Sequence, residues 1–280
     1  EVDMESSGLN FVNMNLHYFR FPFSYFLSAQ KAIDVDKIVF WSSVPHLWVD
    51  QYGAEDAITV LEQARDSGVE VCAYAVRPYN YSLFYPMGTF QQECTKRYYC
   101  RNLEIASQNK ISLVGIDLWG ALRDIDYERQ YTNCIAMLDQ LCQVAKGLGC
   151  KLVVGNVSPR NSAIMNTLAE LQRLVAEVDS DALCIGLDLA EAICQQERIV
   201  DWHKAFGQSL KMVYFSDARN GVTGYPLGTG CCALHLAMKE LQKLKYGGLL
   251  ALRMDRERCE QHPKKVDEIN YSYIRRERKD

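Results

Sequence analysis

The sequence lacks any apolar run long enough to cross a bilayer, because none approaches the roughly 18–20 residues that a spanning helix needs. It also lacks an excess of positive charge: 31 lysines and arginines stand against 35 aspartates and glutamates, and the formal net charge is -4. Surfaces that bind nucleic acid are usually strongly basic, because they neutralise phosphates. We therefore expect neither a membrane nor a nucleic acid as a partner.

Paired cysteine motifs are missing too, although the chain contains 11 cysteines. No C-x-x-C occurs, and most of the cysteines lie inside apolar segments. Disulfide frameworks and zinc ribbons space their cysteines in regular pairs instead. The pattern is typical of reduced, buried thiols and predicts a cytoplasmic protein.

What the sequence does contain is a regular alternation of short apolar runs and segments with helical spacing. Runs that are nearly continuous in Val, Ile, Leu and aromatic residues are typical of parallel strands covered on both faces. The expected strands are Leu9–Met14, Lys37–Trp41, Glu70–Val76, Ser112–Asp117, Lys151–Gly155, Leu183–Asp188, Leu210–Ser216 and Gly248–Arg253. The clearest expected helices are Ala54–Ser67, Thr89–Gln108, Tyr127–Gly147, Ser162–Val178 and Ala233–Leu244.

Eight strands that alternate with helices over 280 residues predict an α/β protein, a (β/α)8 TIM barrel that forms a single domain over residues 1–280. The alternative is an open doubly wound sheet, but no G-x-G-x-x-G follows the first expected strand. In a barrel, the loops after the strands form the C-terminal face, where active sites are built. The longest such loops are expected at Ser42–Gly53, Arg77–Gly88, Leu118–Asp126 and Asp217–Cys231.

The strand ends therefore supply the candidate site residues. Aromatic faces beside Asp, Asn and Arg side chains suit a sugar, so a small carbohydrate-like molecule is the expected ligand. Asp117 and Asp217 either bind that ligand or bond backbone N–H groups of the loops that follow them. The candidate ligand-binding residues are His17, Trp41, His46, Trp119, Tyr214 and Arg253, and the candidate catalytic residues are Asp188, Glu191 and Asp217.

Several segments also occur in an order that resembles a known family. They are Tyr18–Asp50, YNYSLFYPM at Tyr79–Met87, KLVVGNVSP at Lys151–Pro159, CIGLDLA at Cys184–Ala190, MVYFSDARNG at Met212–Gly221 and GYPLGTG at Gly224–Gly230. Together they resemble the xylose-isomerase-like barrels, in particular the sugar-phosphate isomerase and epimerase group with fructoselysine 3-epimerase and the tagatose/psicose 3-epimerases. The resemblance covers nearly the whole chain. It implies a homodimer, or association with an active homologous subunit, as a further expectation.

The resemblance implies one divalent metal, held by Glu, Asp, His and Glu at the ends of the fifth to eighth strands. Carried over, these positions fall on Gly155, Asp188, Tyr214 and Arg253, so Asp188 is the only ligand retained. One ligand cannot hold a hard cation, and Arg253 adds a positive charge that repels it. We therefore expect no metal and no other cofactor; a Mn or Mg site would require the strand ends to align differently.

Two functions from different classes follow from these residues. The first is a non-catalytic or drifted barrel that binds a carbohydrate-like ligand or an active partner subunit. The second is an isomerase or epimerase that moves the proton with Asp188, Glu191 or Asp217 and uses Arg253 as the cation. An abasic-site endonuclease of the same fold is disfavoured by the five poorly placed histidines and the negative charge.

Arg253 itself has two expected roles. In the first, its guanidinium replaces the lost metal by pairing with Asp188 and touching the Tyr214 hydroxyl. In the second, it binds a phosphate or carboxylate of the substrate.

Overall fold

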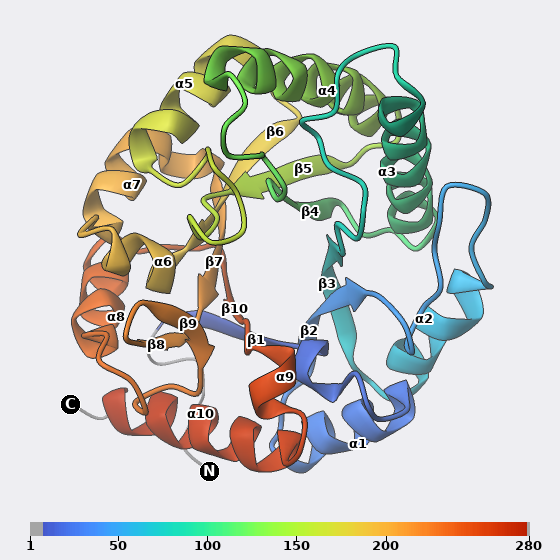
Figure 1. Ribbon diagram of the computed structural model, residues 1–280. Coiled ribbons are helices and arrows are strands. Elements are labelled where there is room, and N and C mark those ends of the chain that lie inside the picture. The colour runs from blue at the N-terminus through green and yellow to red at the C-terminus, as the bar shows by residue number, and fades with distance from the viewer. Residues whose placement is uncertain (1–7, 279–280) are drawn as a thin grey trace.

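The computed structural model describes residues 8–278 and contains a closed barrel of eight parallel strands. Around the barrel the strands follow the order β1-β10-β7-β6-β5-β4-β3-β2, and the helices form an outer ring (Figure 1). The prediction of a (β/α)8 TIM barrel is confirmed. The barrel strands are β1 (Asn10–Met14), β2 (Lys37–Ser42), β3 (Glu70–Val76), β4 (Leu113–Asp117), β5 (Lys151–Gly155), β6 (Leu183–Asp188), β7 (Leu210–Phe215) and β10 (Leu249–Leu252).

The helices follow the strands, as the spacing predicts, and several begin at side-chain caps. Asp56 and Asp126 accept backbone N–H bonds at the starts of α2 and α4, and Thr167 forms a capping box with Glu170 at the start of α5. Among residues 8–278, every helix is too short or too polar to span a bilayer. The helices are α1 (Phe23–Ala32), α2 (Ala57–Asp66), α3 (Phe90–Gln108), α4 (Tyr127–Gly147), α5 (Leu168–Val178), α6 (Leu189–Cys194), α7 (Ile199–Phe206), α8 (Leu234–Lys243), α9 (Arg256–Cys259) and α10 (Pro263–Glu277).

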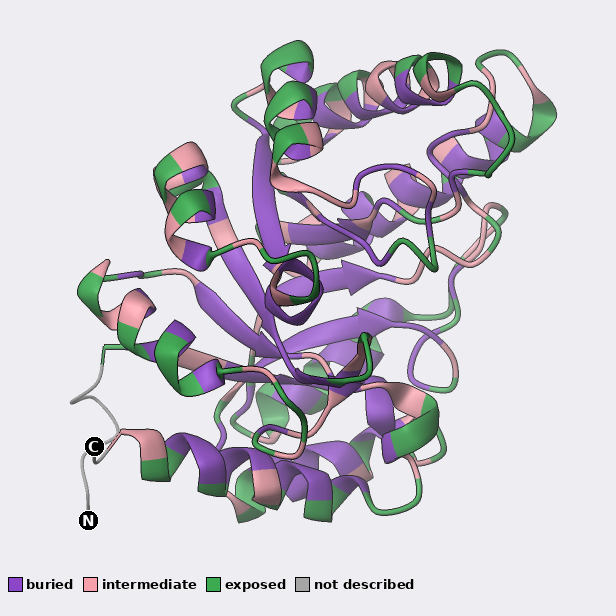
Figure 2. Cartoon of the chain, turned by 60° about the vertical axis from the view of Figure 1, so that its left-hand side comes forward, coloured by how far each residue is buried: buried purple, intermediate pink, exposed green. Residues whose placement is uncertain are grey.

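The strands are buried on both faces because the barrel has two apolar layers (Figure 2). One layer lies between the strands and the helices. The other fills the inside of the barrel with alternate residues of the strands, including Val12, Val39, Val153, Met212 and Tyr214. The same alternation turns the next residues at the strand ends toward the barrel axis, where they reach the C-terminal face.

A small antiparallel hairpin interrupts the expected loop between Asp217 and Cys231. It consists of β8 (Asp217–Arg219) and β9 (Val222–Tyr225). Asn220 and Gly221 join its strands, with φ of 51° and 69°. Both angles lie in the left-handed region, which Asn and Gly tolerate best in tight hairpin turns. The Asn-Gly pair is the sequence signal for this hairpin.

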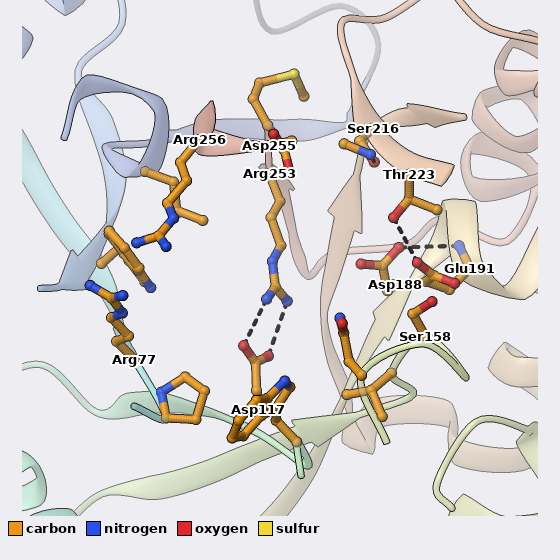
Figure 3. Close-up of a pocket in the computed structure, with 18 of the residues that line it drawn as sticks. Arg77, Asp117, Ser158, Asp188, Glu191, Ser216, Thr223, Arg253, Asp255 and Arg256 are labelled. Atoms are coloured by element: carbon orange, nitrogen blue, oxygen red, sulfur yellow. Dashed lines mark hydrogen bonds and ion pairs between the residues drawn. The ribbon is translucent and has the colours of Figure 1, made fainter. Parts of the chain in front are cut away.

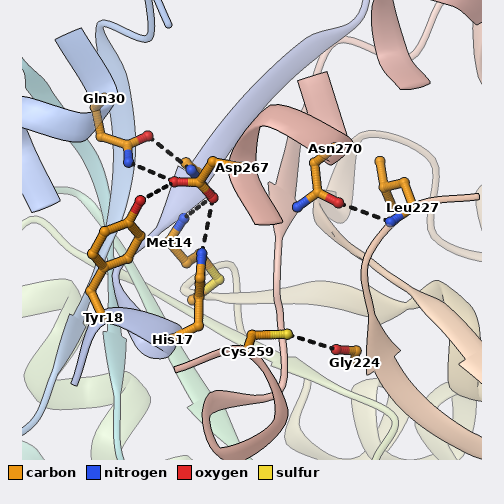
Figure 4. Close-up of polar contacts among 10 residues, drawn as sticks. Met14, His17, Tyr18, Gln30, Gly224, Leu227, Cys259, Asp267 and Asn270 are labelled. Atoms are coloured by element: carbon orange, nitrogen blue, oxygen red, sulfur yellow. Dashed lines mark hydrogen bonds and ion pairs between the residues drawn. The ribbon is translucent and has the colours of Figure 1, made fainter. Parts of the chain in front are cut away.

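The C-terminal helix α10 is fixed to the beginning of the chain by a buried polar network (Figure 4). The Asp267 carboxylate accepts hydrogen bonds from His17 Nε2 at 2.9 Å, the Tyr18 hydroxyl at 2.6 Å and Gln30 Nε2 at 3.0 Å. Gln30 Oε1 in turn accepts a bond from Asn13 at 2.8 Å. Burial alone would raise the pKa of Asp267, but the His17 side chain and the hydrogen bonds outweigh it and lower that pKa.

Candidate functional site

A cavity of about 380 Å³ opens at the C-terminal face of the barrel. This is the face where TIM barrels bind their ligands, and the volume is at the lower end for small-molecule sites. The predicted site residues that line the cavity are Trp41, Trp119, Asp188, Glu191 and Arg253, together with Asp117.

Tyr214 fills the barrel interior next to these residues, at a level where other strands carry glycine. A Cβ at Gly115 would lie 2.7 Å from the Tyr214 hydroxyl, and one at Gly186 would lie 3.4 Å from its ring. The ring therefore occupies space that side chains on β4 and β6 leave free, in the large-against-small packing typical of barrel interiors. Burial raises the pKa of Tyr214, so its hydroxyl stays protonated.

Arg253 and Asp117 form an ion pair across the cavity (Figure 3). Two nitrogens of the Arg253 guanidinium donate to the two Asp117 carboxylate oxygens, at 3.0 and 2.7 Å. Arg253 follows β10 and Asp117 ends β4, which are four places apart in the eight-stranded barrel and so lie opposite each other. The guanidinium also lies 4.9 Å from the centre of the Tyr214 ring.

This pair corrects the expectation that Arg253 pairs with Asp188. Arginine binds a carboxylate most strongly through two parallel N–H bonds, and here Arg253 Nη1 and Nη2 both donate to Asp117. The sequence predicts that Asp117 either binds the ligand or bonds backbone N–H groups of the following loop. Its carboxylate instead accepts both hydrogen bonds from Arg253. Arg253 contacts the face of the Tyr214 ring.

Asp188 and Glu191 form an acidic side of the cavity. Asp188 ends β6 and accepts the backbone N–H of Glu191 at 3.2 Å, so it caps α6. Burial raises the pKa of Asp188 to about 7, and the negative charge of Glu191 adds to the rise, although Arg253 opposes it. Glu191 is held by the Thr223 hydroxyl, which donates to its Oε1 at 2.6 Å from the hairpin strand β9.

Arg77 and Arg256 line the other side of the cavity, and sequence reasoning proposed neither as a binding residue. Arg77 follows β3 directly, whereas Arg256 begins the four-residue helix α9, which no pattern in the sequence signals. The strand-end rule does point to Arg77, although not to a binding role for it. It misses Arg256, which lies beyond the strand end.

Four predicted site residues do not line the cavity: Tyr214, which lies in the barrel interior beneath it, and His17, His46 and Asp217, whose buried contacts correct their expected positions. His17 bonds to Asp267 in the network with α10. His46 is 3% exposed, and its ring nitrogens contact the Phe21 carbonyl and the Asn15 amide. Burial lowers the pKa of His46.

Asp217 is 1% exposed and caps the loop that follows it, which is the second of its two expected roles. Its carboxylate accepts backbone N–H bonds from Ala218 and Gly230 at 2.8 Å and from Cys232 at 3.0 Å. All of its close partners are thus backbone groups of its own loop.

The residues at the strand ends do not fit the metal that the resemblance implies. At Gly155, where a glutamate ligand would stand, a Cβ would overlap the carbonyl oxygen of Gly186. At Arg253, where a second glutamate would stand, a cation is already present and paired. Within residues 8–278, no three His, Cys, Asp or Glu side chains are grouped so that they could hold a metal ion.

Comparisons with known proteins agree with this fold. A family model described as xylose isomerase-like TIM barrel matches residues 29–275. No curated protein matches the chain significantly in sequence.

Solved structures with the same fold include several sugar epimerases. D-psicose 3-epimerase from Clostridium cellulolyticum H10 is 14% identical, with a TM-score of 0.77 and coverage of 96% of this chain and 98% of that chain. The 3-keto-D-glucoside 4-epimerase from E. coli is 15% identical, with a TM-score of 0.72 and coverage of 94% and 99%. A xylose isomerase domain protein from Planctomyces limnophilus is 14% identical, with a TM-score of 0.72 and coverage of 96% and 97%. At these sequence identities, the similarity supports a shared fold and no finer statement.

Proposed function

Because this chain belongs to the xylose isomerase-like TIM barrel family, we propose that its cavity binds a carbohydrate-like ligand without a metal ion. The observation that carries the proposal is the ion pair between Arg253 and Asp117, which occupies the centre of the cavity. A cation bound there would have to displace or repel the guanidinium. The proposed function is therefore ligand binding by a barrel that has lost metal-dependent proton transfer.

The lining of the cavity supports a sugar as the ligand. Trp41 and Trp119 offer aromatic faces, on which the C–H face of a sugar ring can stack. Asn156, Ser158 and Glu191 offer polar groups for hydroxyls. The names of the epimerases that share the fold specify sugar substrates, which is consistent with this ligand class.

The pairing of Arg253 also argues against catalysis. Removal of a proton next to a carbonyl needs a positive group that stabilises the developing enediolate. The charge of Arg253 is already balanced by two hydrogen bonds to Asp117. A ligand-bound barrel of this kind would act as a binding protein or as the partner of an active homologous subunit, in the cytoplasm, where its 11 unpaired thiols would stay reduced.

A metal-independent isomerase or epimerase is the second candidate, and one observation favours it. Asp188 has a pKa raised to about 7 and lies beside Glu191, so the two groups could exchange a proton near neutral pH. Asp217 takes no part in this candidate, because its carboxylate is bound by its own loop.

The experiment that tests the proposal combines metal analysis, binding and turnover on the purified chain. We expect less than stoichiometric Mn, Mg or Zn, saturable binding of a hexose by calorimetry, and no epimerisation of ketohexoses with or without added Mn²⁺. Stoichiometric metal together with metal-dependent turnover would overturn the proposal. Metal-independent turnover that is lost in Asp188→Asn, but kept in the exposed control Asp124→Asn, would establish the second candidate instead.

A further inference from the structure

The charges of the cavity are separated onto two sides. Figure 3 shows Arg77 and Arg256 on one side of the Arg253–Asp117 pair, and Asp188 and Glu191 on the other. The central pair is internally neutral, because one guanidinium binds one carboxylate. A ligand that spans the cavity therefore meets positive groups at one end and acidic and hydroxyl groups at the other.

Arg77 is held in place without an acidic partner. Its Nη1 donates to the Ser43 hydroxyl at 2.9 Å, and its guanidinium lies 4.2 Å from the Tyr79 ring centre and 5.5 Å from that of Trp41. Among the side chains of residues 8–278, no carboxylate lies within ion-pair distance of it. An aromatic face fixes a guanidinium without neutralising it, so its remaining N–H donors are available to an anion.

Arg256 has only a weak acidic neighbour. The nearest carboxylate, that of Glu257, lies 3.6 Å away on a side chain that is 76% exposed. Such exposed pairs contribute little, because solvent screens them. The Arg256 guanidinium lies 5.3 Å from the centre of the Phe19 ring, so it too is positioned by an aromatic side chain.

The opposite side of the cavity is suited to hydroxyl groups. Ser158 and Ser216 line it together with Thr223, whose hydroxyl already bonds Glu191. Carboxylate and hydroxyl oxygens accept hydrogen bonds from the several hydroxyls of a sugar. An anion would be repelled there by Glu191, so it would be directed toward the arginines.

From this arrangement we infer that the ligand is a polyhydroxylated molecule with an acid group at one end, and that Arg77 and Arg256 bind that acid group. This inference rests on the proposed carbohydrate-like ligand and names its chemical class. Arginine forks bind phosphate and carboxylate oxygens in the same way. The acid group is therefore either a sugar phosphate or a sugar carboxylate, and the experiment separates the two.

The test measures the binding of matched hexoses to the full chain by calorimetry. The probes are D-glucose, D-glucose 6-phosphate, D-glucuronate and inorganic phosphate. We expect one of the acid-bearing sugars to bind at least about tenfold more tightly than D-glucose, as expected for charged hydrogen bonds, and to weaken as salt is added. The preferred probe identifies the acid group as phosphate or carboxylate.

Arg77→Gln and Arg256→Gln are the decisive variants. Each is expected to weaken the acid-bearing sugar by about tenfold or more and D-glucose by less than about twofold. Arg65→Gln is the matched control, because Arg65 is 66% exposed on α2 and, within residues 8–278, pairs with Glu62 alone, at 3.8 Å. Circular dichroism and thermal unfolding check that each variant is folded, and Arg256, which lies on a different element, provides a test that does not depend on Arg77.

Each outcome is informative. If neutral and acid-bearing hexoses bind equally well, and the variants leave both unchanged, the acid-group inference is overturned while the carbohydrate proposal stands. If inorganic phosphate binds through Arg77 and Arg256 but no hexose does, the anion site stands and the carbohydrate proposal fails. If none of the four probes binds, both are overturned.

Discussion

The Arg253–Asp117 pair is expected to stabilise the fold as a coupled unit, and a double-mutant cycle measures that coupling. Arg253→Met keeps an unbranched side chain against the Tyr214 ring and removes the charge. Asp117→Asn keeps the shape of the acid and removes its charge. The cycle compares the free energies of unfolding of both single variants and the double variant with that of the unaltered chain.

The expected magnitude follows from the exposure of the pair. Its side chains are 29% and 22% exposed, which places it between two limits. Exposed pairs contribute about 0.2–1 kcal/mol, whereas removal of one partner of a fully buried pair costs about 3–5 kcal/mol. We expect each single substitution to lower the free energy of unfolding by about 2–3 kcal/mol, and the double substitution by about 3 kcal/mol. The coupling energy is then about 2 kcal/mol, because the second substitution no longer leaves a charge without its partner.

Urea unfolding, followed by tryptophan fluorescence and by far-ultraviolet circular dichroism, gives these free energies where the two curves coincide. The surface pair Lys146–Asp181 is the control, because its atoms are 3.2 Å apart but its side chains are 69% and 76% exposed. Its own cycle should give less than about 0.5 kcal/mol. A coupling equally small for Arg253 and Asp117 would refute the reasoning, since two independent sites add within about 0.5 kcal/mol.

Three further predictions concern single residues. Gly155→Ala should lower the free energy of unfolding by at least about 3 kcal/mol or prevent folding, because its Cβ overlaps the Gly186 carbonyl; Gly147→Ala, with open space around it, should change it by less than about 1 kcal/mol in the same urea assay. Asp267→Asn should cost about 2–4 kcal/mol at pH 7. Because the pKa of Asp267 is lowered in the fold, its contribution is complete above about pH 4 and lost as the pH falls below that value, so the variant should show a flatter acid limb; equal slopes would contradict this. The pKa of Asp188 is raised to about 7, so the folded chain keeps a proton that the unfolded chain releases near pH 4, and the free energy of unfolding falls as the pH rises between these values. The free energy of unfolding of Asp188→Asn should therefore rise by up to about 4 kcal/mol relative to that of the unaltered chain between pH 4 and 8. A difference that stays constant over this range would contradict the prediction.

The barrel could be predicted from the sequence because each strand carries its own signal. The expected segments Glu70–Val76 and Lys151–Gly155 coincide with β3 and β5, and Tyr127–Gly147 coincides with α4. Where a side chain decides the boundary, the prediction drifts: the helix expected from Ser162 begins only after Thr167, which caps it with Glu170.

The candidate site could be predicted only in part, because the sequence gives positions at strand ends but not which side chains meet. Trp41, Asp188 and Arg253, which the strand ends indicate, do line the cavity. The sequence could not show that Arg253 reaches Asp117 across the barrel, since that depends on the width of the barrel and on the space that Gly115 leaves for the ring beneath.

The histidine at position 17 shows the other limit of prediction. Its position just after β1 suggests the mouth of the barrel, but it bonds to Asp267, which lies 250 residues further along the chain. No local pattern encodes a partner at that distance.

The same distance has a consequence for how the chain is made. His17, Tyr18 and Gln30 are synthesised well before the carboxylate that they share, because that carboxylate belongs to α10, between 237 and 250 residues later. Until α10 leaves the ribosome, these polar groups must remain solvated or be held by other molecules, because burying them without a partner is costly. Completion of this network is therefore tied to the synthesis of α10, and the nascent chain must stay protected from aggregation until then.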